Sequence, residues 1–204
     1  MLDRMRGYFD EQEELREKAL DISRQVVRAS ARAIAAMHRG DAGVADEMLE
    51  EARAGLVRLK KTVKSDPLWL NSGIVQSAWQ EYCEARLLEG ILKRENLPTP
   101  EELKIPYQPY LGAMADVSGE LRRRVLDLIR ADRVADAERL LGIMEEIHEF
   151  LMSFDYPDAI LPGMKRRQDM VRGVLEKTRG DLTTALRQQK LERALERAKR
   201  KGPK

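Results

Sequence analysis

The sequence is poor in the residues that support disulfide bonds and β-structure. It contains one cysteine, Cys83, so no disulfide can form within the chain, and this fits a reducing compartment. Aromatic residues make up only 5% of the chain, and β-branched residues occur in short runs. Because strands are enriched in β-branched and aromatic side chains, this composition argues against a sheet.

Long apolar runs and the common catalytic motifs are missing too. No stretch approaches the roughly 20 apolar residues that a membrane span needs, and the charged N-terminal segment has no apolar core of a secretory signal. The two histidines, His38 and His148, are far apart and have no metal-ligand spacing. No P-loop, GxGxxG or GxSxG motif occurs. We therefore expect a cytoplasmic protein without these chemistries.

The residues that are abundant favour helices. Ala, Leu, Glu and Arg dominate, with 43% hydrophobic and 35% charged residues, and all four are strong helix formers. Turn residues are sparse, so the connections are short and favour antiparallel neighbours. No internal repeat or sustained heptad is present. We predict a single all-α domain over residues 1–204, an elongated antiparallel bundle of about seven helices whose long apolar stripes favour self-association.

The turn residues predict where the helices end. Gly40 ends the first, Asp41 caps the second, and Thr99 with Pro100 begins a short turn. A bend is expected near Gly180. The long helices are expected over residues 10–38, 41–64, 72–94, 110–130, 133–154, and from 162 almost to the end of the chain.

Two glutamates of the predicted third long helix form the first candidate site. At about 100° per residue, Glu81 and Glu84 lie about 60° apart on one face. Two carboxylates in a small and apolar arc are costly to bury unless a cation compensates them. A divalent metal ion or an arginine of another helix could do so. The residues nearest to that direction are Ile74, Ser77, Ala85, Leu88 and Leu92.

Two acids of the next helix extend this candidate. Asp116 and Glu120 are four residues apart on a mostly charged face, where Arg123 and Arg124 are possible ion-pair partners. Acids from two packed helices can hold Mg²⁺ or Mn²⁺, which take oxygen ligands and activate water against a phosphate. The alternative is a set of ordinary ion-paired acids, because ExxE arises by chance in any glutamate-rich helix.

Basic residues gather in four places although the net charge is only +2. Arg24, Arg28 and Arg32 form one ridge on an alanine-rich helix, which a phosphate backbone could approach closely. The alternative is a solvated face balanced by acids upstream, namely Glu14, Glu17 and Asp21. The other basic groups are Arg58 with Lys60, Lys61 and Lys64, the run 165–167, and a tail at about 186–204 with eight basic and two acidic residues.

Three segments together resemble the translin and translin-associated factor X (TRAX) family. The first helix is similar at Ser23-Arg24, Ser30, Arg32, Ile34 and His38-Arg39. The sequence QEYCEA at 80–85 is similar to a QEYxEA segment, and Tyr110-Leu111 with ADVSGEL at 115–121 to a second motif, although Gly112 is offset by one position. The segment FDYP at 154–157 resembles the archaeal branch of the family.

The resemblance implies a seven-helix bundle that assembles into a hollow homo-octamer enclosing RNA, and an endoribonuclease activity. Glu81, Glu84 and Asp116 match the catalytic acidic positions of TRAX and would hold Mg²⁺ or Mn²⁺, and Glu120 matches a nearby acid. Arg24, Arg28, Arg32 and Lys61 would bind the RNA backbone. The alternatives are a non-catalytic protein binding single-stranded RNA or DNA, as translin itself would be, and an all-α nucleotide pyrophosphohydrolase, which also uses ExxE.

Overall fold

A computed structural model describes residues 1–63 and 66–201, and every regular element among them is an α-helix. The prediction of an all-α fold is therefore confirmed. The chain forms two compact units, Met1–Ala113 and Met114–Lys204. Within the described ranges, no helix combines the length and the apolar character needed to cross a membrane.

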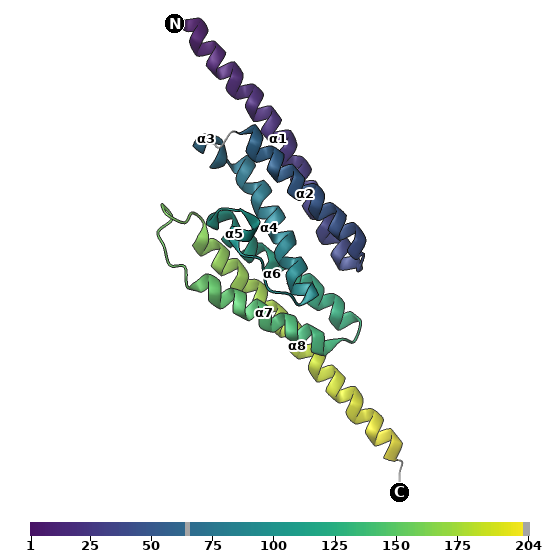
Figure 1. Ribbon diagram of the computed structural model, residues 1–204. Helices are drawn as coiled ribbons and strands as arrows, with labels where there is room; N and C mark the ends of the chain where they lie inside the picture. The colour runs from purple at the N-terminus through teal and green to yellow at the C-terminus, as the bar shows by residue number, and fades with distance from the viewer. Residues whose placement is uncertain (64–65, 202–204) are drawn as a thin grey trace. The chain divides into compact units, whose positions relative to one another are not determined.

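Unit 1 is built on three long helices, α1 (Leu2–Arg39), α2 (Ala42–Thr62) and α4 (Gly73–Lys93). Both α2 and α4 pack along α1 (Figure 1). Two single turns, α3 (Pro67–Leu70) and α5 (Pro100–Leu103), lie in the connections. The helix α6 (Tyr107–Arg130) begins in unit 1 and ends in unit 2.

Local capping sets the ends of these helices. Gly40 has a φ of 78°, and this left-handed conformation ends α1. The Asp41 side chain then accepts a hydrogen bond from the Val44 N–H at the start of α2. Ser72 caps α4 in the same way, and Thr99 and Glu102 form a complete capping box around α5.

The long helices of unit 1 pack through small residues. Ala29, Ala33 and Ala36 of α1 are at most 2% exposed. A Cβ atom at Gly55 of α2 would lie 2.6 Å from Cγ2 of Val26, so the glycine lets α2 approach α1 closely. The Ser23 hydroxyl of α1 donates a 2.7 Å hydrogen bond to the Ile74 carbonyl at the start of α4.

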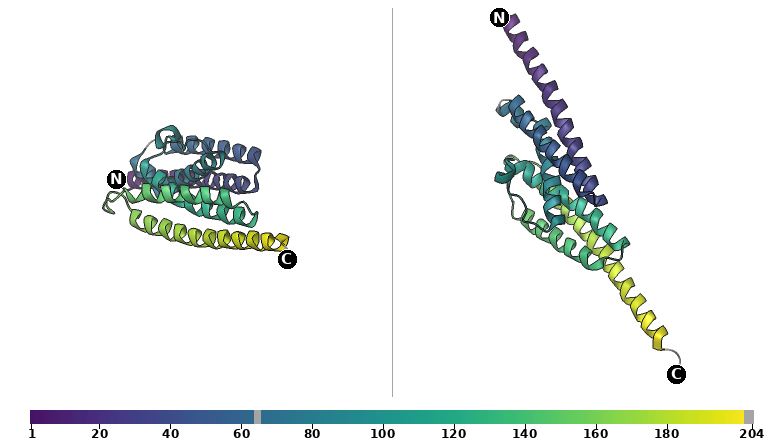
Figure 2. Two further views of the ribbon diagram at one scale, coloured as in Figure 1. Left: turned by 90° about the horizontal axis from the view of Figure 1, so that it is seen from below. Right: turned by 45° about the vertical axis from the view of Figure 1, so that its right-hand side comes forward.

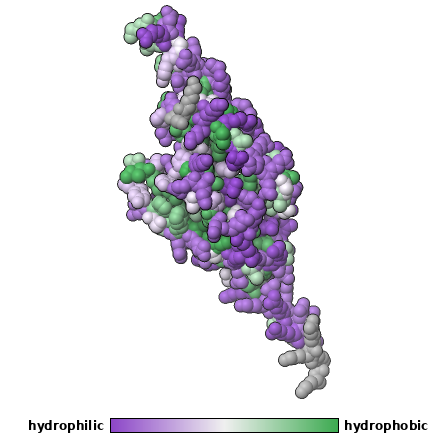
Figure 3. Space-filling model, in the orientation of Figure 1, coloured by the Kyte–Doolittle hydropathy of each residue, from purple (hydrophilic) through white to green (hydrophobic). Residues whose placement is uncertain are grey.

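The N-terminal part of α1 extends past α2, because α1 has 38 residues and α2 has 21. Figure 3 shows hydrophobic surface at this end of the chain. The exposed large hydrophobic side chains there are Met1, Leu2, Met5, Tyr8 and Phe9. The helix begins at Leu2 and not near residue 10 as the sequence predicted. No side chain caps this end, and the helix continues through Gly7 without a break.

Unit 2 contains the remainder of α6 together with α7 (Val134–Met152) and α8 (Met164–Lys201). The Gln168 amide of α8 donates to the carbonyls of Leu151 and Phe154, and Arg179 pairs with Glu145 at 2.7 Å. These contacts show that α7 and α8 run antiparallel. The Arg122 guanidinium of α6 donates a 3.1 Å hydrogen bond to the Thr178 hydroxyl of α8 and pairs with Asp181 at 2.8 Å.

The core of unit 2 is built from apolar stripes of its helices. The fully buried side chains include Val117 and Leu121 of α6, Leu140 and Met144 of α7, and Val171 of α8. Each such side chain contributes roughly 1.5–3 kcal/mol when it leaves water.

The C-terminal half of α8 extends past α7 (Figures 1 and 2). With 38 residues against 19, α8 is about twice as long as α7 at ~1.5 Å per residue. It passes through Gly180 as one unbroken helix, so the expected bend does not interrupt it. A glycine inside a helix costs some free energy but does not by itself break the hydrogen-bond ladder.

Two further predicted boundaries differ from the structure. The sequence placed the start of α6 after Pro109, but the helix begins at Tyr107. Proline is tolerated within the first turn because its missing N–H has no partner there anyway. The last helix begins at Met164 and not near Pro162, since Gly163 before it has a φ of 72° and lies outside the helix.

Candidate functional site

The helix α4 carries Glu81 and Glu84 in unit 1. Glu84 is 9% exposed and is the one charged side chain among the buried residues of the described chain, while Glu81 is half-buried. Next to Glu84, Ala85 and Leu88 are fully buried. A carboxylate in such surroundings is costly to bury unless a partner compensates its charge, so Glu84 has the largest desolvation cost of the four candidate acids.

Cys83 lies between the two glutamates in sequence but is not a candidate ligand. Its side chain is 0% exposed. Burial, with the nearby charge of Glu84 as the second cause, raises the pKa of the Cys83 thiol to about 12. The thiol is therefore protonated at neutral pH, and a metal ion or an electrophile requires the thiolate.

The helix α6 carries Asp116 and Glu120 in unit 2, where both are half-buried. Asp116 Oδ1 lies 3.5 Å from Nη1 of Arg167, which is near the start of α8. Glu120 Oε2 lies 3.8 Å from Nη1 of Arg123, one turn along α6. These two acids thus have basic partners within their own unit.

Sequence reasoning did not connect Arg167 with Asp116. It offered Arg123 and Arg124 as neighbours of Asp116, but the structure pairs Arg123 with Glu120 and Arg167 with Asp116. The run 165–167 was a visible signal, because basic residues in the first turn oppose the helix dipole. An acidic partner on another helix explains why Arg167 is tolerated there.

The predicted metal ligands are distributed over both units, with Glu81 and Glu84 in unit 1 and Asp116 in unit 2. Among the described residues of either unit taken alone, no three His, Cys, Asp or Glu side chains gather closely enough to hold a metal ion. The donor chemistry nevertheless suits Mg²⁺, which prefers carboxylate oxygens and often uses only one or two of them. The metal site therefore stays a prediction.

The basic ridge of α1 is exposed along its whole length. Arg24, Arg28 and Arg32 all project into solvent, and no acid within residues 1–63 and 66–201 forms an ion pair with any of them. The upstream acids that could have balanced this charge have other partners. Glu14 pairs with Lys18, Glu17 with Arg16, and Asp21 with Gln25.

The second basic group lies at the end of α2. Lys61 and Lys60 are exposed in the last turn of α2. Arg58 donates a 3.0 Å hydrogen bond to the Gln25 side chain and so adjoins the ridge of α1. Lys64 lies outside the described residues.

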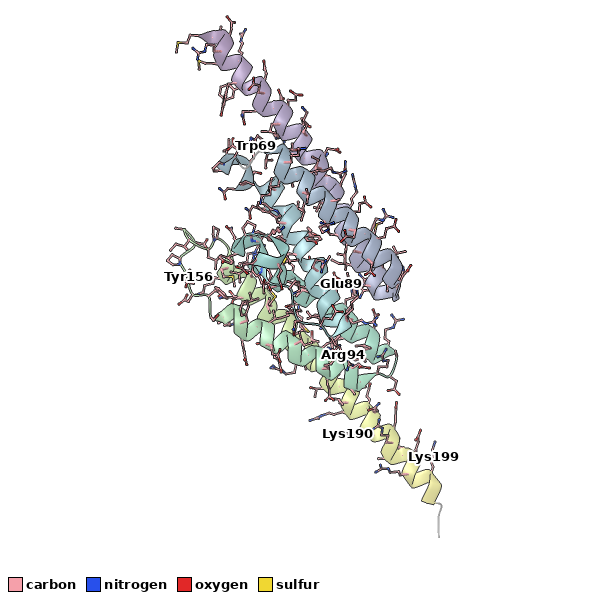
Figure 4. All side chains as sticks on the ribbon, viewed as in Figure 1. Trp69, Glu89, Arg94, Tyr156, Lys190 and Lys199 are labelled. Atoms are coloured by element: carbon pink, nitrogen blue, oxygen red, sulfur yellow. The ribbon has the colours of Figure 1, made fainter. Side chains whose placement is uncertain are left out.

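The basic tail is helical as far as the structure describes it. Exposed cations project from α8 beyond the end of α7, and Figure 4 marks Lys190 and Lys199 among them. Lys204 lies outside the described residues. A helix with cations along its length is suited to contact phosphates.

Comparisons with known proteins agree on one family. A family model described as the translin family matches residues 14–179. An uncharacterized protein of Methanocaldococcus jannaschii is 34% identical over 194 residues, which cover 94% of this chain and 85% of that protein.

Solved structures give the same result. The crystal structure of AfC3PO has a TM-score of 0.81 at 31% identity and covers 90% of this chain and 96% of its own. The structure of AfC3PO in complex with duplex RNA has a TM-score of 0.78 at 30% identity and covers 90% and 95%. The crystal structure of apo-NeC3PO, with a TM-score of 0.81 at 22% identity, covers 90% and 96% and shows a likeness of fold alone.

Proposed function

This chain belongs to the translin family, and we propose that it is a metal-dependent endoribonuclease that binds RNA inside a shell of identical subunits. The support for RNA is AfC3PO, a relative at 30% identity that has been solved with duplex RNA. On this chain the exposed ridge of α1 and Lys61 bind the phosphate backbone without reading the base sequence. The cations in this role are Arg24, Arg28, Arg32 and Lys61.

Four acids carry the hydrolysis in this proposal. Glu81, Glu84 and Asp116 hold the metal ion through carboxylate oxygens, and Glu120 is a nearby acid that assists. Mg²⁺ or Mn²⁺, when bound, supplies positive charge that activates water and offsets the charge developing on the phosphate. The protein's own part is to hold these carboxylates in place against the RNA backbone.

The burial of Glu84 is the observation that carries this proposal. An acid needed only for solubility would lie in water, whereas Glu84 is 9% exposed on a helix whose neighbouring side chains are apolar. Perturbed and poorly solvated carboxylates concentrate at functional sites. Spacing alone would not have separated Glu84 from the many other glutamates of the chain.

A homo-octameric shell is the assembly that we propose. Apolar side chains are exposed at the free ends of the two longest helices, including Leu2 and Phe9 of α1 and Leu191 and Leu195 of α8. Exposed apolar residues grouped on projecting helices are typical of protein–protein interfaces. A native mass of eight subunits, measured alone and with RNA, is the expected result, and a monomer would contradict the shell.

The test of the activity is cleavage of a single-stranded RNA with Mg²⁺ present. Glu84→Gln keeps the size of the side chain and removes its charge, so the rate should fall by about a hundredfold or more. Glu138→Gln, an exposed acid of α7, is the matched control and should leave the rate unchanged. A wild-type rate in Glu84→Gln would show that the acids are wrongly assigned.

The second candidate is an RNA- or DNA-binding protein without nuclease activity. The ion pair between Asp116 and Arg167 favours it, because an acid that already has a basic partner needs no metal ion to explain it. This candidate predicts salt-sensitive RNA binding by the wild-type protein and no cleavage with Mg²⁺ or Mn²⁺.

A further inference from the structure

Unit 1 contains a cleft of about 730 Å³ between α2, α4 and the segment that includes α5. This volume lies within the range of small-molecule sites. The α4 residues that line it include Trp79, Tyr82 and Arg86, and Figure 4 marks another of them, Glu89. At 100° per residue, the mean direction of these four residues lies roughly 150° around the helix from that of Glu81 and Glu84, so the cleft faces away from the proposed catalytic acids.

One wall of the cleft is apolar. It includes Val57 of α2, which is 61% exposed, and Leu97 and Pro98 of the loop after α4, whereas Trp79 and Tyr82 of α4 contribute little surface because they are only 6% and 3% exposed. The loop packs closely on α4 at Gly90, where a Cβ atom would lie 3.4 Å from Cδ2 of Leu97. An apolar wall suits a flat apolar group of a ligand, such as a nucleobase.

The cations of the cleft are only partly neutralised. Lys60 of α2 and Lys104 after α5 line it, are exposed, and form no ion pair within the described part of the chain. Arg86 Nε lies 3.1 Å from Glu89 Oε2, and Arg53 of α2 pairs with Glu50, which is not part of the lining, at 2.9 Å. Four cations thus line the cleft.

The acids of the cleft are largely engaged elsewhere. Glu89 also pairs with Lys93 at 2.7 Å, and Glu102 accepts a 2.8 Å hydrogen bond from the Thr99 N–H in the capping box. Glu95 is the remaining acid of the lining, against Lys60 and Lys104. The lining contains four cations and three acids, so its formal charge is +1, and it favours an anionic ligand.

From the apolar wall and this positive rim we infer that the cleft binds a nucleoside monophosphate, either free or as the terminal nucleotide of an RNA strand. The base packs against the apolar wall of Val57, Leu97 and Pro98, close to Trp79, and the phosphate is held by Lys60, Arg86 and Lys104. Binding at this site does not require cleavage. Glu84→Gln should therefore keep it even where that variant loses nuclease activity.

The experiment is a fluorescence titration with adenosine 5′-monophosphate (AMP) in a Trp69→Phe background, so that Trp79 is the single tryptophan. We expect saturable quenching by AMP. The double variant Lys60→Ala, Lys104→Asn should bind AMP at least tenfold more weakly. Asparagine tolerates the left-handed backbone at residue 104, where φ is 57°. Lys18→Ala, an exposed lysine of α1 outside the cleft, is the matched control and should bind AMP as the background protein does.

Further arms separate the two sources of the ligand. Adenosine should bind at least tenfold more weakly than AMP, since it lacks the phosphate. Displacement of AMP by a 5′-phosphorylated oligoribonucleotide but not by its 5′-hydroxyl form would identify the strand end as the ligand, and displacement by neither would identify the free nucleotide. The proposal is overturned if AMP does not saturate, or if its binding is unaffected both by the lysine substitutions and by Arg86→Lys.

Discussion

The two units hold their acids in different ways. In unit 1, Glu84 is buried next to fully buried Cys83 and Ala85. In unit 2, Asp116 is about a third exposed and lies 3.5 Å from Arg167, and Glu145 pairs with Arg179 near the surface. Exposed ion pairs contribute only ~0–1 kcal/mol, and they account for the acids that form them. A buried carboxylate costs far more to remove from water than an exposed one, so burial, more than charge or spacing, distinguishes Glu84.

The largest expected difference between the units is in the reactivity of a thiol, which unit 1 provides in Cys83. Burial, and next the charge of Glu84, raises the pKa of the Cys83 thiol from 9.0 to about 12, so its thiolate fraction near neutral pH should fall about a thousandfold on folding. Iodoacetamide at pH 8 should therefore leave the native protein unlabelled and label the urea-unfolded chain, as measured by mass spectrometry.

The control for Cys83 lies in unit 2. Ser153→Cys places a thiol at an exposed position after α7, and this thiol should be labelled in the native protein. The sign of the stability effect follows from the raised pKa. The neutral thiol is favoured in the folded state, so its contribution is complete below pH 9 and is lost as the pH rises from about 9 towards 12. Equal labelling of both thiols in the native protein would show that the Cys83 side chain is not buried in unit 1.

Local chemistry explains why much of the fold could be predicted from the sequence. Gly40, Ser72 and Thr99 end or begin helices through contacts within four residues, so short motifs specify them. The start of α1 at Leu2 has no side-chain cap, and no motif could have marked it. Glu81 and Glu84 could likewise be grouped from the sequence, because residues three apart lie on the same face of a helix.

Contacts between distant segments could not be predicted in this way. The pair of Asp116 with Arg167 spans 51 residues, and a single sequence does not say which helix faces which. The cleft on α4 was missed for the same reason, since Lys60 and Lys104 approach one another only after α2 and α5 have packed around α4. The sequence nevertheless contained a signal in the basic run at 165–167.

The comparison predicts that Asp116 and Arg167 behave differently when each is changed. If Asp116 acts in cleavage, Asp116→Asn should lower the rate by about a hundredfold or more. Arg167→Gln breaks the same ion pair but removes no acid, so it should change the rate by no more than about fivefold, the equivalent of ~1 kcal/mol. Single-turnover cleavage of one RNA measures both variants. Equal losses would mean that Asp116 serves to hold Arg167 and takes no part in the chemistry.

The smallest expected effect concerns packing. Gly55 lies where α2 meets α1, and a Cβ atom there would be 2.6 Å from Cγ2 of Val26, a branched side chain with little freedom to move. Gly55→Ala should therefore lower the free energy of unfolding by ~1–3 kcal/mol. Gly180→Ala is the matched change in unit 2, where nothing lies within 4 Å of the new atom. Because alanine is a better helix former than glycine, this variant should be more stable by ~0.5–1 kcal/mol. Urea unfolding followed by circular dichroism measures both changes, and the same sign for the two variants would contradict the close approach of α1 and α2 at Gly55.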